Sequence, residues 1–141
     1  MQVETILQTK GRAVHTVTAD TSLADAVTML TERRIGAVVV LDGKKVVGIL
    51  SERDIVRHLG KDWAALASRP VRDVMTSAVV TTGRYATVTE IMEQMTERRI
   101  RHVPVVEGGE LVGIVSIGDV VKRKIEETEQ EATALKEYIA S

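Results

Sequence analysis

The sequence predicts an α+β fold: two tandem β-α-β-β-α repeats packed sheet to sheet with pseudo-twofold symmetry, followed by a C-terminal helix. Three observations lead to this prediction. The chain repeats itself at an offset of 65 residues (residue 31 matches residue 96), and each copy carries the same order of strand and helix signals. The last residues are highly charged, with apolar positions at helical spacing.

The internal repeat is densest between residues 31 and 57. The segment TERRI at 31–35 returns at 96–100, and VGI at 47–49 returns at 112–114. Of the 27 positions from 31 to 57, 14 hold the same residue 65 places later. Identity at one fixed offset means two copies of one supersecondary unit, and two such units can cover each other's open apolar face.

Each copy begins with a β-rich stretch, at residues 13–17 in the first and at 78–81 in the second. An amphipathic helix follows, opened by Ser-x-x-Asp at 22–25 and by Thr-x-x-Glu at 87–90. Both patterns predict a capping box, in which the hydroxyl and the acidic side chain bond backbone N–H groups at the helix start. The apolar residues after them recur at helical spacing.

The rest of each copy is a hairpin and a second helix. Two apolar runs flank Asp-Gly at 42–43 and Gly-Gly at 108–109, which are typical hairpin turns. A second helix is predicted to start at Ser51 and at Ser116. The first of these ends near Gly60, a favourable C-terminal cap.

We divide the chain accordingly into a first repeat over residues 1–60, a linker over 61–75, a second repeat over 76–126 and a C-terminal amphipathic helical tail over 127–141. The linker is expected to contain a short helix. This helix ends before Pro70, because a proline disfavours the helical conformation in the residue that precedes it.

The C-terminal segment carries apolar or small residues 4, 3, 4, 3 and 4 places apart, at Val121, Ile125, Thr128, Ala132, Leu135 and Ile139. This heptad-like spacing predicts a helix that packs against a second chain or back onto its own module, with a frayed amphipathic tail as the alternative. Two small repeats with such a tail leave apolar surface uncovered, so the sequence predicts a homodimer.

The composition excludes several classes of partner and site. Nineteen Lys and Arg balance twenty Asp and Glu, and one Trp, two Tyr and no Phe leave few rings for stacking bases, so no nucleic acid is expected. The longest purely apolar run, at 37–41, is too short for a membrane span, and no signal-peptide pattern opens the chain; a cytoplasmic location is expected. Without cysteine, and with three histidines that lack ligand spacing, no metal site is predicted.

The most specific motif is Gly-Ile-[Leu or Val]-Ser-x-x-Asp, at 48–54 and again at 113–119. Its Ser-x-x-Asp part can simply cap a helix. The same geometry can bind a ligand, because a helix N-terminus offers N–H groups to a phosphate and a nearby carboxylate accepts hydrogen bonds from ribose hydroxyls. Two copies at equivalent places, each after a predicted buried strand, favour a nucleotide site.

The doubled motif, the repeated hairpin unit and the segment RHVPVV at 101–106 resemble a pair of CBS domains, a Bateman module, over residues 1–126. The resemblance is to stand-alone CBS-domain proteins of bacterial type. It implies a non-enzymatic regulatory module that binds AMP, ADP, ATP, NAD or S-adenosylmethionine in clefts between its repeats, and that often forms disc-shaped dimers. It implies no catalytic residue and no metal.

The resemblance also implies site residues. Asp54 would hold the ribose of one ligand, with Ser51 and Arg53 near its phosphate. The opposite wall of that cleft would consist of Thr76, Ala78, Val80, Arg101, His102, Val103 and Pro104. In the second cleft, Asp119 and Ser116 would face a matching wall. That wall consists of His15, Ile35, Gly36, Ala37 and Val38.

The two clefts are predicted to differ in charge. The Arg-His pair at 101–102 is matched by Gly-Ala at 36–37 in the first repeat, so the first cleft gathers more cations and should prefer the more anionic ligand. Extra residues near the N-terminus leave open whether Thr9 or Lys10 takes the place that Thr76 has in the other repeat.

The sequence therefore predicts an energy or nucleotide sensor that passes a conformational change to a protein target not named by the sequence. The alternatives are a structural or protein-interaction module without a ligand, a sensor of S-adenosylmethionine and, less favoured, a small enzyme acting on nucleotides. Ser51, Asp54 and His58 are not expected to form a hydrolytic triad, because on one helix the base cannot lie between the acid and the nucleophile.

Overall fold

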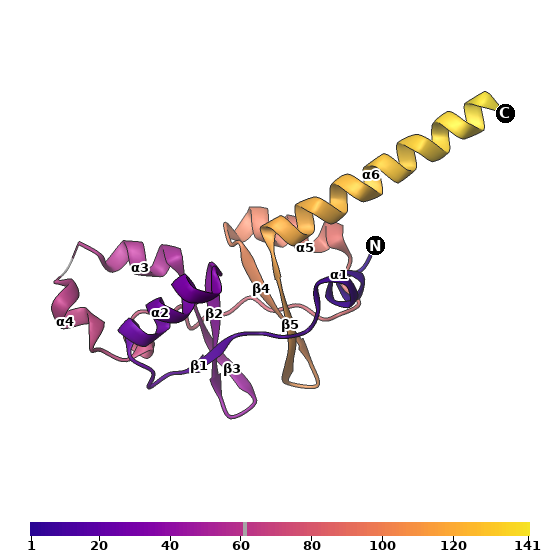
Figure 1. The fold of residues 1–141 in the computed structure, drawn as a ribbon. Helices are drawn as coiled ribbons and strands as arrows, with labels where there is room; N and C mark the ends of the chain where they lie inside the picture. Colours follow the sequence, from indigo (N-terminus) through magenta and orange to yellow (C-terminus); the bar gives the residue numbers. More distant parts are fainter. Residues whose placement is uncertain (61) are drawn as a thin grey trace. The chain divides into compact units, whose positions relative to one another are not determined.

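The computed structural model describes residues 1–60 and 62–141, so Lys61, the first residue of the predicted linker, lies outside the described residues. Both helices and strands are present in each half of the chain (Figure 1). In order they are α1 (Val3–Lys10), β1 (Thr16–Thr18), α2 (Leu23–Arg33), β2 (Ala37–Asp42), β3 (Lys45–Ser51), α3 (Glu52–His58), α4 (Trp63–Ala67), the 3-10 helix η1 (Val71–Asp73), α5 (Val88–Arg98), β4 (His102–Glu107), β5 (Glu110–Ser116) and α6 (Ile117–Ala140).

The described residues form two compact units that do not follow chain order. Unit 1 contains residues 1–12, 81–107 and 113–141, and unit 2 contains residues 13–80 and 108–112. The N-terminal helix α1 therefore folds with the second sequence repeat, while the segment that links the repeats folds with the first. The sequence repeats and the compact units divide the chain differently.

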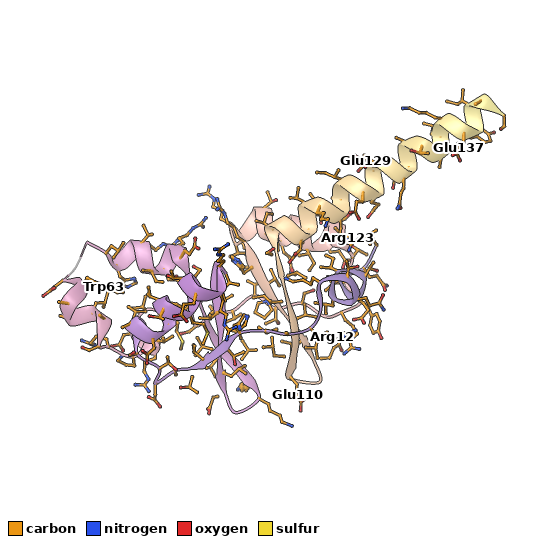
Figure 2. The ribbon with its side chains drawn as sticks, in the orientation of Figure 1. Arg12, Trp63, Glu110, Arg123, Glu129 and Glu137 are labelled. Atoms are coloured by element: carbon orange, nitrogen blue, oxygen red, sulfur yellow. The ribbon has the colours of Figure 1, made fainter. Side chains whose placement is uncertain are left out.

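Unit 2 is built on a three-stranded sheet in the order β1-β2-β3. Strand β1 runs parallel to β2, and β2 pairs antiparallel with β3 through the predicted hairpin. The central strand β2 is buried from Ala37 to Val40, and α2 adds Leu23 and Leu30 to the same core. The linker closes this core with Val71, and Trp63 of α4 (labelled in Figure 2) packs against it.

The predicted helix starts are confirmed. At the start of α2 the predicted capping box is only half formed: the side chain of Ser22 accepts a hydrogen bond from the backbone N–H of Asp25, but the Asp25 carboxylate does not bond the Ser22 N–H. Thr87, Ser51 and Ser116 each form a capping box, at the starts of α5, α3 and α6. The short linker helix α4 is also present, over Trp63–Ala67. These local signals suffice because capping satisfies N–H groups that the helix itself leaves unpaired.

Unit 1 differs from the prediction in one strand. Strands β4 and β5 pair across the Gly-Gly turn, where both glycines have positive φ (56° and 81°). Residues 78–81 were expected to add a third strand, but they are not a strand; a single parallel bridge joins Thr82 to Val105 instead. The Thr82 N–H donates to the Pro104 carbonyl (3.0 Å), and the Val106 N–H donates to the Thr82 carbonyl (2.8 Å), so the pairing beside β4 is centred on this one residue.

The N-terminal helix covers unit 1 closely. Val3, Ile6 and Leu7 of α1 are buried, and a Cβ placed on Gly113 would lie 2.6 Å from Cδ2 of Leu7. The equivalent glycine of the first motif, Gly48, lies equally close to the side chain of Met75. The glycine at this motif position therefore lets another segment of the chain approach the strand closely. We call it the covering segment: it is α1 in unit 1 and the segment around Met75 in unit 2.

This close approach predicts a measurable coupling between two residues. Gly113→Ala should lower the free energy of unfolding by about 1–3 kcal/mol through overpacking. Leu7→Ala should lower it by about 2–5 kcal/mol through cavity formation. In the double variant the smaller residue at 7 makes room for the new methyl group, so the combined loss should be smaller than the sum by about 1 kcal/mol. Urea unfolding of the four proteins measures this difference.

Gly60→Ala serves as the control, because nothing lies within 4 Å of a Cβ placed on Gly60. Its free energy of unfolding should stay within about 0.5 kcal/mol of the parent. Strict additivity of Gly113→Ala and Leu7→Ala would contradict the contact between α1 and β5.

Candidate functional site

The first motif forms a tight joint between strand β3 and helix α3. The backbone N–H of Ser51 donates to Oδ2 of Asp54 (2.9 Å), and the N–H of Asp54 donates to Oγ of Ser51 (3.3 Å). The Ser51 hydroxyl also donates to the same carboxylate oxygen (3.1 Å). Because the serine ends the strand and the aspartate lies in the first helical turn, this reciprocal bonding fixes where the carboxylate points.

The linker supplies a third partner to this carboxylate. The Thr76 hydroxyl donates to Oδ1 of Asp54 (3.0 Å), and the Thr76 backbone pairs with Ile49 of β3 through two hydrogen bonds (2.9 and 3.0 Å). Asp54 is 6% exposed and is the buried charged residue of the described part of the chain. The structure thus brings together three of the predicted site residues, Ser51, Asp54 and Thr76, within unit 2.

The start of α3 offers fewer backbone donors to a phosphate than the sequence suggests. The N–H of Glu52 donates to the carbonyl of Gly36 (3.0 Å), and that of Asp54 donates to Ser51 Oγ. Two of the first three N–H groups are therefore used inside the chain. The second motif repeats the arrangement, since the Ile117 N–H donates to the carbonyl of Arg101 (2.8 Å). The backbone N–H groups at these two helix starts are therefore largely used inside the chain.

The second motif has a different partner for its carboxylate. Ser116 and Asp119 form the same capping box (2.9 and 3.2 Å), but Lys10 Nζ lies 2.7 Å from Oδ2 of Asp119. Lys10 also donates to the carbonyl of Ile114 (3.1 Å), which is the equivalent of Ile49 at the 65-residue offset. Lys10 thus takes the place that Thr76 has in unit 2.

The sequence left open whether Thr9 or Lys10 is the counterpart of Thr76, and the structure shows that it is Lys10. The Thr9 hydroxyl donates to the carbonyl of Thr5 within α1, so Thr9 does not reach the motif. The lysine also gives the Asp119 motif a cation of its own, which the comparison of the two repeats had not revealed.

The ion pair changes the titration of Asp119. Partial burial raises the pKa of this carboxyl group, but the hydrogen bond and charge of Lys10, together with hydrogen bonds from Ser116, outweigh burial and hold the pKa below its ordinary value. A depressed carboxyl pKa stabilises the folded state at any pH above the ordinary value, and this contribution is lost as the pH falls through the folded-state pKa.

The other predicted site residues differ in burial. Those exposed to solvent are His15, Arg53, Ala78 and Arg101. Those partly buried are Ile35, Gly36, Val80 and His102. Those buried are Ala37, Val38, Val103 and Pro104, which can present backbone but little side chain to a ligand. These residues are divided between the two compact units.

The structure also bears on a hydrolytic triad, a metal site and a membrane span. His58 Nδ1 lies 2.7 Å from the backbone carbonyl of Asp54 and not from its carboxylate. Ser51, Asp54 and His58 therefore do not form a catalytic triad. Among the described residues there is no cluster of three or more metal-binding side chains, and no described helix is both long and apolar enough to cross a membrane.

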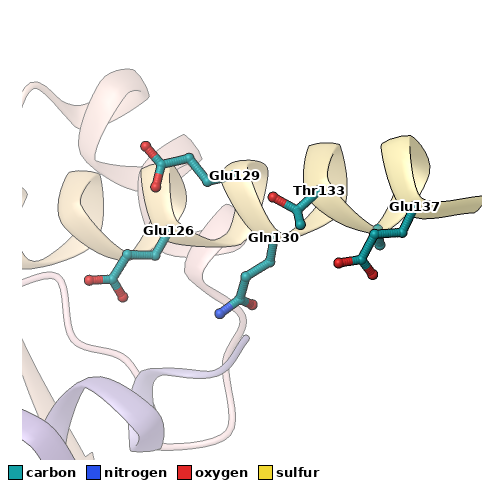
Figure 3. Close-up of a pocket in the computed structure, with 6 residues that line it drawn as sticks. Glu126, Glu129, Gln130, Thr133 and Glu137 are labelled. Carbon is teal, nitrogen blue, oxygen red and sulfur yellow. The ribbon is translucent and has the colours of Figure 1, made fainter. Parts of the chain in front are cut away.

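A shallow hollow on the surface is unrelated to the motifs (Figure 3). All the residues that line it come from α6: Glu126, Glu129, Gln130, Thr133, Ala134 and Glu137. Side chains of a single helix cannot enclose a nucleotide, so we place no ligand there.

Comparison with known proteins agrees with the repeated motif and its geometry. The model of the CBS domain matches the chain twice, at residues 7–61 and 71–126. The chain belongs to the CBS-domain family. The two matches cover most of the sequence and both copies of the Gly-Ile-[Leu or Val]-Ser-x-x-Asp motif. The chain thus has an α+β fold with two CBS repeats and a long C-terminal helix.

Solved structures of CBS-domain proteins are similar over nearly the whole chain. A CBS-domain containing protein from Agrobacterium tumefaciens is 45% identical, with a TM-score of 0.84 over 88% of this chain and 99% of that one. A CBS domain protein from Pyrobaculum aerophilum complexed with AMP is 29% identical (TM-score 0.74; 84% and 89% covered). The CBS domain pair of protein MJ0100, in complex with 5'-methylthioadenosine and S-adenosyl-L-methionine, is 25% identical (TM-score 0.79; 90% and 98% covered).

The Lys10–Asp119 pair generates a prediction with a defined pH dependence. Lys10→Met should raise the pKa of Asp119 and lower the free energy of unfolding by about 0.5–1 kcal/mol near pH 7, as expected for a partly exposed ion pair. The difference from the parent should begin to shrink as the pH falls below about 4, the ordinary pKa of an aspartate, and should be lost as the pH falls through the depressed pKa that Asp119 has in the parent. Urea unfolding at several pH values measures it.

Lys44→Met is the matched control, because the Lys44 side chain is 83% exposed and its pair with Glu110 is long (3.6 Å). It should change stability little at any pH. A Lys10→Met effect of equal size at pH 3 and pH 7 would show that Lys10 acts by packing and not through its charge.

Proposed function

We propose that this CBS-domain protein is a regulatory module that binds an adenosine nucleotide at the Asp54 motif and performs no chemistry of its own. The observation that carries the proposal is the buried Asp54 carboxylate, held at the strand-to-helix joint beside the exposed residue Thr76. The ligands of the two relatives, AMP and S-adenosylmethionine with methylthioadenosine, share an adenosine group, so the ribose is the common feature to be recognised.

The chemistry of Asp54 suits a ribose. A carboxylate has about four lone-pair positions, and three of the hydrogen bonds at Asp54 come from Ser51 N–H, Ser51 O–H and Thr76 O–H. The Thr76 hydroxyl can rotate away, because it belongs to an exposed side chain. The two hydroxyls of a ribose would then take its place and add a further charge-assisted hydrogen bond.

This exchange also supplies a mechanism for sensing. Thr76 is the first residue after the linker, and its hydroxyl ties the end of the linker to α3 through Asp54. A ligand that displaces the hydroxyl removes one tie while the backbone pairing with Ile49 remains. The binding energy can therefore shift the position of the linker, which a protein target would detect.

We propose that the Asp54 motif binds more tightly than the Asp119 motif. At Asp119 a ribose must compete with the charged Lys10 ammonium, whereas at Asp54 it competes with a neutral hydroxyl. Both bonds end on a carboxylate, but the ammonium adds the attraction of a second, opposite charge and should therefore be harder to displace than a hydroxyl. Arg53, which the family resemblance places near the phosphate, remains a proposed ligand-binding residue.

One observation favours a second candidate, a structural module without a ligand. Asp54 already accepts three hydrogen bonds inside the chain, so its burial needs no ligand to be tolerated. In this alternative Asp54 only clasps the linker to α3.

Two substitutions separate the candidates. Asp54→Asn keeps the shape of the side chain but removes the charge, and should weaken nucleotide binding about 10- to 100-fold, the loss of charge-assisted hydrogen bonds. Thr76→Val removes the competing hydroxyl, and should leave affinity unchanged or raise it a few-fold. Isothermal calorimetry with AMP, ATP, NAD and S-adenosylmethionine measures both effects and the number of sites.

Asp25→Asn is the control, because Asp25 also sits in the first turn of a capped helix but belongs to no motif. It should bind like the parent. Unaltered affinity in Asp54→Asn, together with lower stability, would support the clasp, and so would the absence of binding by the parent to any of the four compounds.

A further inference from the structure

The second half of α6 extends away from unit 1. Val120 is the buried residue of this helix, and the last ties to unit 1 are the bond from Lys124 Nζ to Thr89 Oγ1 (3.3 Å) and the pairing of Glu127 with the N-terminal amine (3.7 Å). From residue 128 onward every residue is exposed. Figure 1 shows α6 running on past α5, and Figure 2 shows the side chains of Glu129 and Glu137 on this projecting part.

A projecting helix of this length is not stable by itself. Residues 128–140 span about 20 Å at 1.5 Å per residue, and isolated helices of fewer than about 12–15 residues are marginal in water. A continuous helix to Ala140 therefore calls for a partner along the projecting part.

The helix carries an apolar stripe with the geometry of a coiled-coil seam. Its large members are exposed: Val121 41%, Ile125 53%, Leu135 59% and Ile139 74%. With Thr128 and Ala132 between them, the spacing assigns residues 125, 132 and 139 to heptad position a, and residues 121, 128 and 135 to position d. No other assignment fits this alternation of four and three.

The residues beside the stripe select a parallel orientation. The g positions hold Lys124, Glu131 and Tyr138, and the e positions hold Lys122, Glu129 and Lys136. In a parallel coiled coil each g residue meets the e residue of the following heptad on the other chain. Lys124 then meets the partner's Glu129, and Glu131 meets the partner's Lys136. Both contacts join opposite charges, and twofold symmetry doubles each of them.

The antiparallel orientation brings like charges together. With the stripes aligned about residue 130, g positions meet g positions and e positions meet e positions. Glu131 would meet its own copy, Glu129 would meet its own copy, and Lys122 would meet the partner's Lys136. Each contact is repulsive, so this orientation is disfavoured by charge.

We propose that α6 pairs with α6 of a second copy of this chain as a parallel, in-register two-stranded coiled coil over residues 121–139. The pairing covers the exposed apolar stripe and satisfies the charge pattern beside it. The acidic hollow of Figure 3 lies on the remaining outer positions: its lining residues occupy positions b, c, e and f and include no residue of the seam. This inference does not depend on nucleotide binding.

The charge pattern gives a test by reversal. In sedimentation equilibrium of the full chain, Glu131→Lys should weaken dimerisation on the order of 10-fold, because two attractive contacts become repulsive. Lys136→Glu in the same chain should restore the affinity. Glu137→Lys is the matched control: it makes the same charge change at an outward f position, and it should leave the affinity unchanged.

Orientation is tested by cross-linking. The chain contains no cysteine, so Ile139→Cys introduces a single thiol. In the parallel dimer the two thiols face each other at position a and should form an interchain disulfide rapidly under mild oxidation. In an antiparallel dimer residue 139 faces residue 121 and the thiols lie far apart. Lys122→Cys, outside the seam and near the other end of the helix, should cross-link much more slowly.

Several results would overturn the proposal. They are a monomeric parent at micromolar concentration, a dimer indifferent to Glu131→Lys, and failure of Ile139→Cys to cross-link. A dimer formed through another surface would show the last two results together, so the cross-link separates it from the coiled coil. Leu135→Asp adds a second check, since a charge in the seam should weaken dimerisation at least about 100-fold if the helices pair.

Discussion

The strand-to-helix joint made by Ser-x-x-Asp is the interaction on which the rest of this protein depends. It ends a strand, starts a helix and fixes a carboxylate in a single step, because the serine and aspartate satisfy each other's backbone N–H groups. A covering segment then meets the carboxylate: Thr76 reaches Asp54, and Lys10 reaches Asp119. The same joint therefore holds the fold together and presents the group proposed to bind a ligand.

The two joints show how one geometry yields different chemistry. A neutral hydroxyl leaves Asp54 able to exchange partners, while an ammonium group holds Asp119 in an ion pair. The backbone donors at both helix starts are largely occupied, so the proposed selectivity comes from side chains and not from the helix dipole alone. A single difference between the covering segments, Thr76 in one and Lys10 in the other, gives the two carboxylates partners of different charge.

Much of the fold could be predicted from the sequence, because capping boxes and glycine turns act locally and the repeat doubles every signal. The grouping of Ser51 with Asp54 followed from the same local pattern. Lys10 could not be assigned, because it lies outside the aligned part of the repeat and reaches Asp119 only through the folding of α1 onto unit 1. The strand predicted at 78–81 was wrong: Thr82, the next residue, bridges to Val105 instead, and the β-propensity of a short segment does not register its tertiary context.

The division of the chain between its units bears on how the protein folds during synthesis. Unit 2 is nearly contiguous, so most of it can form while translation continues. Unit 1 joins residues 1–12 to residues that follow Val80, so its closing contacts span most of the chain and are entropically slow to form. Residues 1–12 leave the ribosome before the rest of unit 1 and are thus among the last to find their place. Until β5 emerges, Leu7 of α1 lacks the strand that it packs against in the folded protein.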